Sequence, residues 1–361
     1  MAPGLHLSVA LDDTGRHPST PDDDSGLHTS TPDDGPGWHT SASDDGARFT
    51  PEYWVELVRE AERGLLDFVT FEDDLGPVGR LDAVLVASRV APLTSRIGLV
   101  PTVVAAHTEP FHLSKAIATL DYVSTGRAGV RVRASGSPEA ARHFGRREIT
   151  ADTPLADLLD ETADYVEVLR RLWDSWEDDA EIRDVATGRF IDRDKLHYVD
   201  FAGKWFSVKG PSITPRPPQG QPPVAVLSHA SPVHALARRS SDLVFTTPHS
   251  AEDVRTIGAE VEGLLNFVDV VVGFGREDAP ESDAFVFTGS PGELADLLVE
   301  WHAAGADGFR LRPASLPDDL RVITRELVPL LQERGVFRTE YTATTLRGHL
   351  GLPRPANRYA A

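Results

Sequence analysis

The feature that most constrains the fold of this chain is a regular alternation of two kinds of segment. From residue 5 onward, short apolar runs rich in β-branched residues alternate with longer segments in which apolar residues recur with helical periodicity. This alternation is typical of parallel strands joined by crossover helices. Eight runs fit strands, at about residues 5–11, 66–71, 96–105, 127–134, 222–228, 242–246, 266–273 and 307–312.

Helix signals fill the intervals between these runs. Thr50 as N-cap, Pro51 as first helical residue and Glu52 in the first turn predict one helix start, and Ser290 before Pro291 predicts another. Other helices fit about residues 80–92, 108–124, 154–176, 231–239, 251–264 and 316–334. Eight strands with eight helices, and no G-x-G-x-x-G after the first strand, predict a (β/α)8 TIM barrel of the α/β class rather than a doubly wound sheet.

The predicted barrel is one domain over residues 1–361, with a C-terminal tail at 335–361. A long excursion precedes the fifth strand, and an expanded loop at 17–49 follows the first. The chain has no cysteine and its only methionine is Met1, which excludes disulfides, thiolate nucleophiles and cysteine metal sites. Any chemistry must therefore use His, carboxylates, hydroxyls or a cofactor.

The loop at 17–49 contains three tandem eleven-residue repeats, which begin at His17, His28 and His39 and each carry an aspartate pair. Their Pro, Asp, Ser and Gly content cannot bury a core, so we interpret them as a surface loop. A metal-binding lid is the alternative, because imidazoles and carboxylates are suitable ligands. The spacing fixes no coordination geometry, and no metal site is predicted.

Charge and hydropathy limit the partners. The formal net charge of -20 repels phosphate backbones and anionic lipid, so neither nucleic acid nor membrane is an expected partner. No run of about 18 apolar residues occurs, and the N-terminus lacks a basic region before its short apolar stretch. We therefore expect a cytoplasmic protein.

Polar residues stand at the carboxyl ends of the predicted strands, where a barrel of this kind carries its active site. The second strand ends in Glu72 and Asp73, the third carries Thr102, and the fourth contains Arg131 and Arg133. The acid pair could act in general acid–base catalysis, but exposed acids are common in a chain with 56 of them. No G-x-S-x-G occurs, so no hydrolase is predicted.

The fifth predicted strand ends in Ser228-His229-Ala230-Ser231-Pro232. Ser231 as N-cap with Pro232 as first helical residue leaves backbone N–H groups directed at the barrel mouth, which favours phosphate binding. The alternative is that Ser231 only caps its helix.

Three stretches carry a resemblance to a known family. They are RIGLVPTVVAAHTEPFHLSKAIATLDYVSTGRAG at 96–129, YVEVLRRLWDSWEDDA at 165–180 with FAGKWFSVKGPSITPRPPQGQPP at 201–223, and GADGFRLRPASLPDDLRVITRELVPLLQERGVFRTEYTATTLRGHLGLPRP at 305–355. Together they resemble the luciferase-like flavin-dependent monooxygenases, in the branch of nitrilotriacetate monooxygenase component A, pristinamycin synthase and dibenzothiophene-sulfone monooxygenase. The resemblance covers nearly the whole chain.

The resemblance implies a flavoprotein oxidoreductase. Its barrel binds reduced FMN supplied by a separate flavin reductase, and uses oxygen to oxidise a small organic substrate. A deazaflavin coenzyme is the alternative cofactor in the wider superfamily. The protein mainly positions the cofactor and excludes water, which fits a chain in which no catalytic residue is predicted. A homo-oligomer is also implied.

Four residues match the family's flavin contacts. Asp73 stands at the family's strand-end aspartate, Thr102 and Ser135 stand at hydroxyl positions of the third and fourth strands, and Ser231 matches the serine of the family's phosphate motif. The resemblance therefore predicts a cofactor site at Asp73, Thr102, Ser135 and Ser231.

Other positions depart from the family pattern. Family hydroxyls align with Val104 and Ala105, its His and Tyr align with Leu155 and Leu159, and a glycine aligns with His229. Each lost hydrogen bond is worth about 0.5–1.5 kcal/mol, and a side chain in place of glycine blocks close backbone approach.

These departures leave two alternatives. Arg131, Arg133 and His229 could supply compensating charge to a phosphate, or the two arginines could form ion pairs with the many acids. If flavin binding is lost, the chain is a catalytically degenerate paralogue that acts as a structural or partner subunit without a cofactor.

Overall fold

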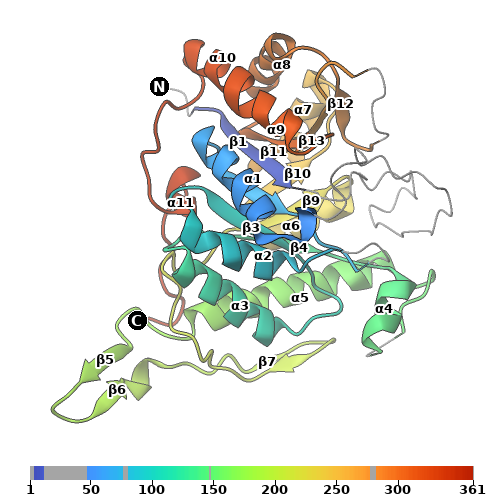
Figure 1. The fold of residues 1–361 in the computed structure, drawn as a ribbon. Helices are drawn as coiled ribbons and strands as arrows, with labels where there is room; N and C mark the ends of the chain where they lie inside the picture. Colours follow the sequence, from blue (N-terminus) through green and yellow to red (C-terminus); the bar gives the residue numbers. More distant parts are fainter. Residues whose placement is uncertain (1–3, 12–46, 76–79, 146–147, 277–281, 361) are drawn as a thin grey trace.

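A computed structural model describes residues 4–11, 47–75, 80–145, 148–276 and 282–360 (Figure 1). Eight parallel strands are hydrogen-bonded in the order β10-β9-β4-β3-β2-β1-β13-β11, and pairing of β10 with β11 closes the ring. The predicted (β/α)8 barrel is confirmed. The barrel strands are β1 (His6–Leu11), β2 (Phe68–Phe71), β3 (Gly98–Val104), β4 (Val130–Arg133), β9 (Val224–Ser228), β10 (Leu243–Thr246), β11 (Leu265–Val272) and β13 (Gly308–Pro313).

Helices surround the barrel, and each predicted helix overlaps an observed one. They are α1 (Pro51–Arg63), α2 (Ala83–Val90), α3 (Pro110–Val123), α5 (Leu155–Asp174), α6 (Ser231–Ser240), α7 (Ala251–Glu260), α8 (Pro291–Ala303), and finally α9 (Asp318–Val322) and α10 (Val328–Glu333) joined by a π-helical turn at Ile323–Leu327. The predicted caps are present, because Tyr53 N lies 3.4 Å from Thr50 Oγ1 and Ser290 forms a capping box with Glu293.

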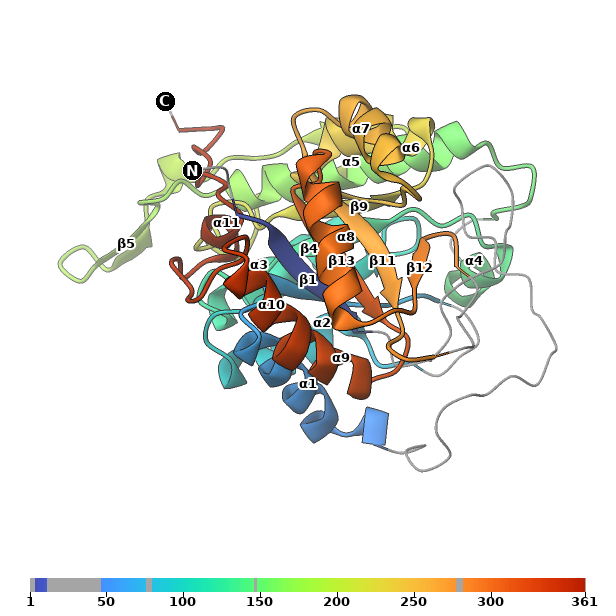
Figure 2. The same ribbon diagram turned by 90° about the horizontal axis from the view of Figure 1, so that it is seen from above.

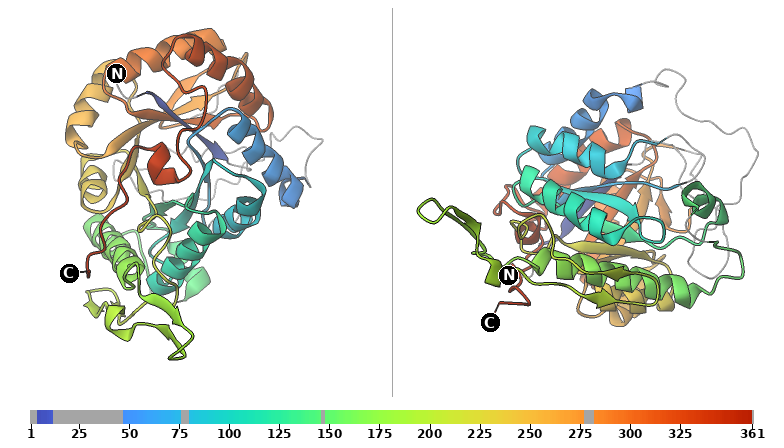
Figure 3. Two further views of the ribbon diagram at one scale, coloured as in Figure 1. Left: turned by 90° about the vertical axis from the view of Figure 1, so that its left-hand side faces the viewer. Right: turned by 90° about the horizontal axis from the view of Figure 1, so that it is seen from below.

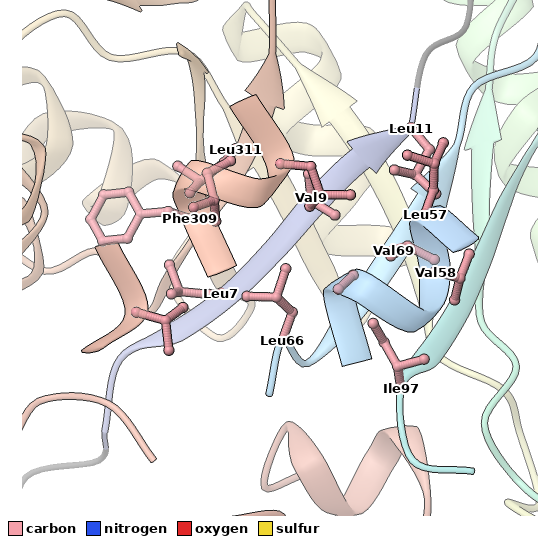
Figure 4. Close-up of a cluster of buried hydrophobic side chains, with 14 of the residues drawn as sticks. Leu7, Val9, Leu11, Leu57, Val58, Leu66, Val69, Ile97, Phe309 and Leu311 are labelled. Atoms are coloured by element: carbon pink, nitrogen blue, oxygen red, sulfur yellow. The ribbon is translucent and has the colours of Figure 1, made fainter. Parts of the chain in front are cut away.

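Side chains alternate in direction along each barrel strand, so the core has an outer part, under the helices, and an inner part, inside the barrel. Leu7, Val9 and Leu11 of β1 point outward and pack with Val58 of α1 and Leu311 of β13 (Figure 4). Because successive side chains of a strand point to opposite faces, the residues between them face the barrel interior.

An apolar plug fills the interior at the amino ends of the strands. Phe68, Phe245 and Phe267 pack there with Leu346 of α11 (Leu346–His349), so the C-terminal segment crosses this end of the barrel (Figure 3). A Cβ on Gly98 would lie 2.6 Å from Leu346 Cδ1, so glycine allows this close approach. The functional end is the opposite, carboxyl end.

The excursion before the fifth barrel strand is also observed. Between α5 and β9 the chain forms two hairpins, β5 (Glu181–Asp184) with β6 (Arg189–Ile191) and β7 (Phe201–Ala202) with β8 (Ser207–Val208). The first hairpin projects away from the barrel, at the label β5 in Figure 2. Smaller elements are α4 (Pro138–Phe144), β12 (Phe285–Phe287) and 3-10 turns at Ala47–Phe49, Ala91–Leu93 and Arg193–Lys195.

Only Ala47–Phe49 of the predicted repeat loop at 17–49 is among the described residues, so the interpretation of its repeats stays a prediction. Within the described part of the chain, no group of three His, Asp or Glu side chains is arranged to hold a metal ion. No helix there is both long and apolar enough to cross a bilayer.

Candidate active site at the carboxyl ends of the strands

A layer of buried charges crosses the barrel interior. Arg131 faces inward, because Val130 and Val132 on either side of it pack outward with α3 and α5. Its guanidinium forms an ion pair with Glu72, which follows β2. From the far side of the barrel, Arg310 donates to Glu72 Oε1 at 3.1 Å and to Asp269 Oδ1 at 2.7 Å.

The charges of this layer hold one another ionised. Burial raises the pKa of Glu72, but the positive charges of Arg131, Arg310 and Arg312 outweigh burial and hold the pKa well below its ordinary value. Burial lowers the pKa of Arg131 to about 10, against the opposing effect of Glu72. Below the layer, the Arg310 guanidinium lies 4.3 Å from the ring centroid of Phe245, over the apolar plug.

Asp73 follows β2, and Thr102 lies on the neighbouring strand β3. Asp73 Oδ2 accepts from the backbone N–H of Ala83 at 3.0 Å, which ties this carboxylate to the start of α2. Burial raises the pKa of Asp73 to about 6, and the nearby acids Asp82 and Asp74 act in the same direction. Thr102 is buried, and its Oγ1 lies 3.5 Å from Arg131 Nη1.

Ser135 and Ser231 have local partners. Ser135 Oγ lies 3.4 Å from the backbone N of Ser137, in the turn after β4. The predicted N-cap at Ser231 is wrong, because the N-cap of α6 is Ala230 and Ser231 is its first helical residue. Within the described ranges, no hydrogen bond joins any two of Asp73, Thr102, Ser135 and Ser231.

A carboxylate occupies the predicted phosphate position at the start of α6. Ser231 Oγ donates to Glu260 Oε2 at 2.9 Å, and His234 Nδ1 lies 2.8 Å from the same oxygen. A phosphate at this point would meet the negative charge of Glu260. The start of α6 therefore does not fit an anion in this arrangement.

A cavity of about 30 Å³ lies between the carboxyl ends of β4 and β9, lined by Arg131, Arg133, Leu159, His229 and neighbouring apolar side chains. This volume exceeds the roughly 10–15 Å³ that a single water needs. Leu159 and His229 thus fill space where the resemblance implies a phenol and a glycine. Leu155 packs elsewhere, against a small cluster that contains Ile149.

His229 has two partners at Nδ1. Its Nδ1 lies 3.1 Å from Thr247 Oγ1 and 3.1 Å from Asp283 Oδ2. Burial lowers the pKa of His229, against the opposing charges of Asp283 and Asp269.

The expectation that both β4 arginines form ion pairs is confirmed for Arg131 and wrong for Arg133. Arg133 faces the same interior as Arg131, yet it forms no hydrogen bond or ion pair with the described residues. Asp269, Arg310 and Arg312 were not predicted from the sequence as members of the interior layer. Charged residues at alternate positions of a buried strand, as in Arg310-Leu311-Arg312, were the signal that could have found them.

The closed parallel barrel defines a TIM-barrel protein. Its candidate active site lies at the carboxyl ends of the strands, where acids, hydroxyls and guanidinium groups gather. The family model described as luciferase-like monooxygenase matches residues 27–265. The chain belongs to the luciferase-like monooxygenase family.

Individual relatives agree with this membership. The chain is 29% identical to N-acetyl-S-(2-succino)cysteine monooxygenase of Bacillus subtilis (strain 168), over 86% of this chain and 91% of the relative. It is 31% identical to one of the subunits of pristinamycin IIA synthase of Streptomyces pristinaespiralis, over 84% and 90%. The solved structure of EDTA monooxygenase from Chelativorans sp. BNC1 has the same fold, with a TM-score of 0.80 at 22% identity over 97% of this chain and 99% of that one. The predicted family and branch are confirmed, and the chain is a member of a family of oxidoreductases.

Proposed function

We propose that this protein is a flavin-dependent monooxygenase that uses reduced FMN and oxygen to oxidise a small organic substrate. The observation that carries the proposal is the family match over residues 27–265 of a closed barrel with a polar mouth. The supply of reduced FMN by a separate flavin reductase is part of the proposal, and its support is the similarity to nitrilotriacetate monooxygenase component A of Aminobacter aminovorans, at 28% identity. A cytoplasmic location and a homo-oligomer remain predictions.

The chemistry of the mouth residues fits a flavin on one side of the barrel. A flavin mononucleotide requires hydrogen-bonding groups for its ring edge and positive charge or N–H groups for its phosphate. Asp73, just after β2, and Thr102, on the adjacent strand β3, offer the first kind of group. Arg133 offers the second, whereas the start of α6 is taken by Glu260.

When bound, reduced FMN supplies the electrons that activate oxygen. The residues of the chain then have three tasks. The apolar plug of Phe68, Phe245 and Phe267 excludes water from below. The ion-paired layer holds fixed charges under the mouth without reorganisation. Asp73 can hold or release a proton at its carboxylate near neutral pH, because its pKa is raised to about 6.

A catalytically degenerate paralogue is the second candidate, and one observation favours it. Leu159 and His229 narrow the space between β4 and β9 to a cavity of about 30 Å³. Loss of cofactor binding would turn the barrel into a scaffold. An enzyme of the same fold that uses a deazaflavin coenzyme is a third candidate.

The test is anaerobic premixing of the protein with photoreduced FMN, followed by rapid mixing with aerated buffer. A monooxygenase of this kind is expected to change the time course of flavin reoxidation relative to free flavin, because bound flavin is shielded from water. A time course identical to that of free flavin at saturating protein would contradict the proposal and favour the degenerate paralogue. The same experiment with reduced deazaflavin separates the third candidate.

A further inference from the structure

Two guanidinium groups on β4 have hydrogen-bonding capacity that the protein does not use. Arg133 has no hydrogen bond or ion pair with the described residues, and the buried Nε of Arg131 has no hydrogen-bond partner among them. Arg131 is buried and Arg133 is partly buried. A buried donor without a partner costs free energy, and a partly buried one costs less because solvent reaches it. A ligand with hydrogen-bond acceptor oxygens would satisfy these donors at the mouth of the barrel.

Another buried arginine of the same barrel shows the contrast. Arg127 donates to the backbone oxygens of Ala91 and Ile97 at 2.8 Å and of Ser124 at 2.7 Å, so its guanidinium is satisfied within the fold. Carbonyl oxygens at a loop can therefore satisfy an interior arginine in this chain. Unlike Arg127, Nε of Arg131 and the guanidinium of Arg133 donate to no backbone oxygen of the described residues.

The acids near the two β4 arginines already form ion pairs with other arginines. Glu72 binds both Arg131 and Arg310, and Asp269 binds Arg310. On the rim, Asp74 lies 3.8 Å from the guanidinium of Arg80. Burial lowers the pKa of Arg133, against the opposing negative charges of Asp74 and Glu72. Neither of these two described acids forms an ion pair with the Arg133 guanidinium, so positive charge at the end of β4 is incompletely neutralised.

The geometry points to an oxyanion-binding site at the carboxyl end of β4, formed by Arg133 with Nε of Arg131. The two side chains are two residues apart on one strand, face the same side and line the same cavity with His229. A planar guanidinium binds two oxygens of a carboxylate, sulfonate or phosphate at once. The anion is either the phosphate of the flavin or an acidic group of the organic substrate; only this choice of source rests on the proposed function.

This site replaces the start of α6 as the anion site of the barrel. There, Glu260 already accepts from Ser231 and pairs with His234, and it would repel an incoming phosphate. At β4 the described residues of the cavity wall carry guanidinium groups and no carboxylate. Substitution therefore distinguishes the two positions: loss of the Arg133 guanidinium should weaken anion binding, and loss of the Ser231 hydroxyl should not.

The experiment compares full-length wild type with Arg133→Met, Arg133→Lys and Ser231→Ala. Arg239→Met is the matched control, since Arg239 is an exposed arginine paired with Asp160 on the outer surface. Two equilibrium measurements are made on each protein. The first is calorimetric titration of the protein with inorganic phosphate and with succinate. The second is anaerobic titration with photoreduced FMN and photoreduced riboflavin, which lacks the phosphate.

Arg133→Met is expected to weaken phosphate or succinate binding about ten- to a hundredfold, with Arg133→Lys intermediate and the two other variants unchanged. If the flavin supplies the anion, the preference of wild type for FMN over riboflavin falls by the same factor. If the substrate supplies it, FMN and riboflavin binding stay unchanged while succinate binding is lost.

Three results would overturn the site: equal anion binding by wild type and Arg133→Met, an equal loss in Arg239→Met, or loss of the FMN preference in Ser231→Ala alone. Failure of the proposed function is distinguishable. In that case neither flavin binds any of the proteins, while binding of phosphate or succinate still depends on Arg133. Circular dichroism of each variant verifies that the fold is intact.

Discussion

Replacement of Glu72 by glutamine tests the interior charge layer directly. Glu72 is the acid shared by Arg131 of β4 and Arg310 of β13, so Glu72→Gln removes one negative charge from between two buried guanidinium groups. The glutamine has nearly the same volume and keeps one acceptor oxygen. The change therefore isolates charge from packing.

The expected cost follows from the geometry. Removing one partner of a buried ion pair costs about 3–5 kcal/mol, because the remaining charge is left without compensation. Arg310 retains Asp269 as a partner at 2.7 Å, so the loss falls mainly on Arg131. We expect a decrease of about 3 kcal/mol in the free energy of unfolding at neutral pH.

The pH dependence of stability provides a second, independent test of the Glu72→Gln prediction. The surrounding arginines hold the pKa of Glu72 below its ordinary value of 4.5. Glu72 therefore contributes stability above that value, and the contribution is lost as the pH falls below it toward the folded-state pKa. Wild type and Glu72→Gln should differ most at neutral pH and converge in acid.

The assay is urea unfolding followed by circular dichroism at neutral pH and in acid. Glu333→Gln is the control, because Glu333 is exposed at the end of α10 and should leave stability unchanged. The double variant Glu72→Gln with Arg131→Met should cost less than the sum of the single variants. Equal stability of wild type and Glu72→Gln at neutral pH, or a difference that does not change with pH, would refute the reasoning.

Three other substitutions test separate parts of the structure. Asp73→Asn should stabilise the fold above about pH 6 and have little effect below about pH 4. The folded-state pKa of Asp73 is raised from 3.8 to about 6, so ionisation of this carboxyl costs stability as the pH rises, and urea midpoints at both ends of the range would measure the difference. Trp173→Ala should cost about 3–5 kcal/mol in urea unfolding, because this buried indole packs α5 and donates to Ser114 O at 3.0 Å. Gly64→Ala should cost about 1–3 kcal/mol by the same measurement, because its Cβ would lie 2.6 Å from Thr324 Cγ2; unchanged stability would show that the helices can move apart.

The barrel could be predicted from the sequence because its signals are local. Buried parallel strands are short β-branched runs, and helix starts carry caps such as Thr50 and Ser290, whose partners lie three residues away. Closure of the ring then follows from the count of strand and helix pairs. Each of these signals depends on a few neighbouring residues.

The chemistry of the mouth could be predicted only in part, because its partners are distant in the sequence. Glu72 and Arg310 are 238 residues apart, and Ser231 and Glu260 are 29 apart. The sequence places Ser231 at a helix start, but only the packing of α6 against α7 brings Glu260 to it. The unpaired state of Arg133 among the described residues likewise depends on which acids the other strands have already engaged.

The most direct test of the central claim is an anaerobic titration of the purified protein with reduced FMN, followed by calorimetry or flavin fluorescence and repeated with reduced deazaflavin. The account predicts saturable binding of reduced FMN with micromolar or tighter affinity, which is about -8 kcal/mol or more favourable. No binding of reduced FMN would contradict the account: binding of the deazaflavin alone would favour the deazaflavin enzyme, and binding of neither cofactor would favour the degenerate paralogue.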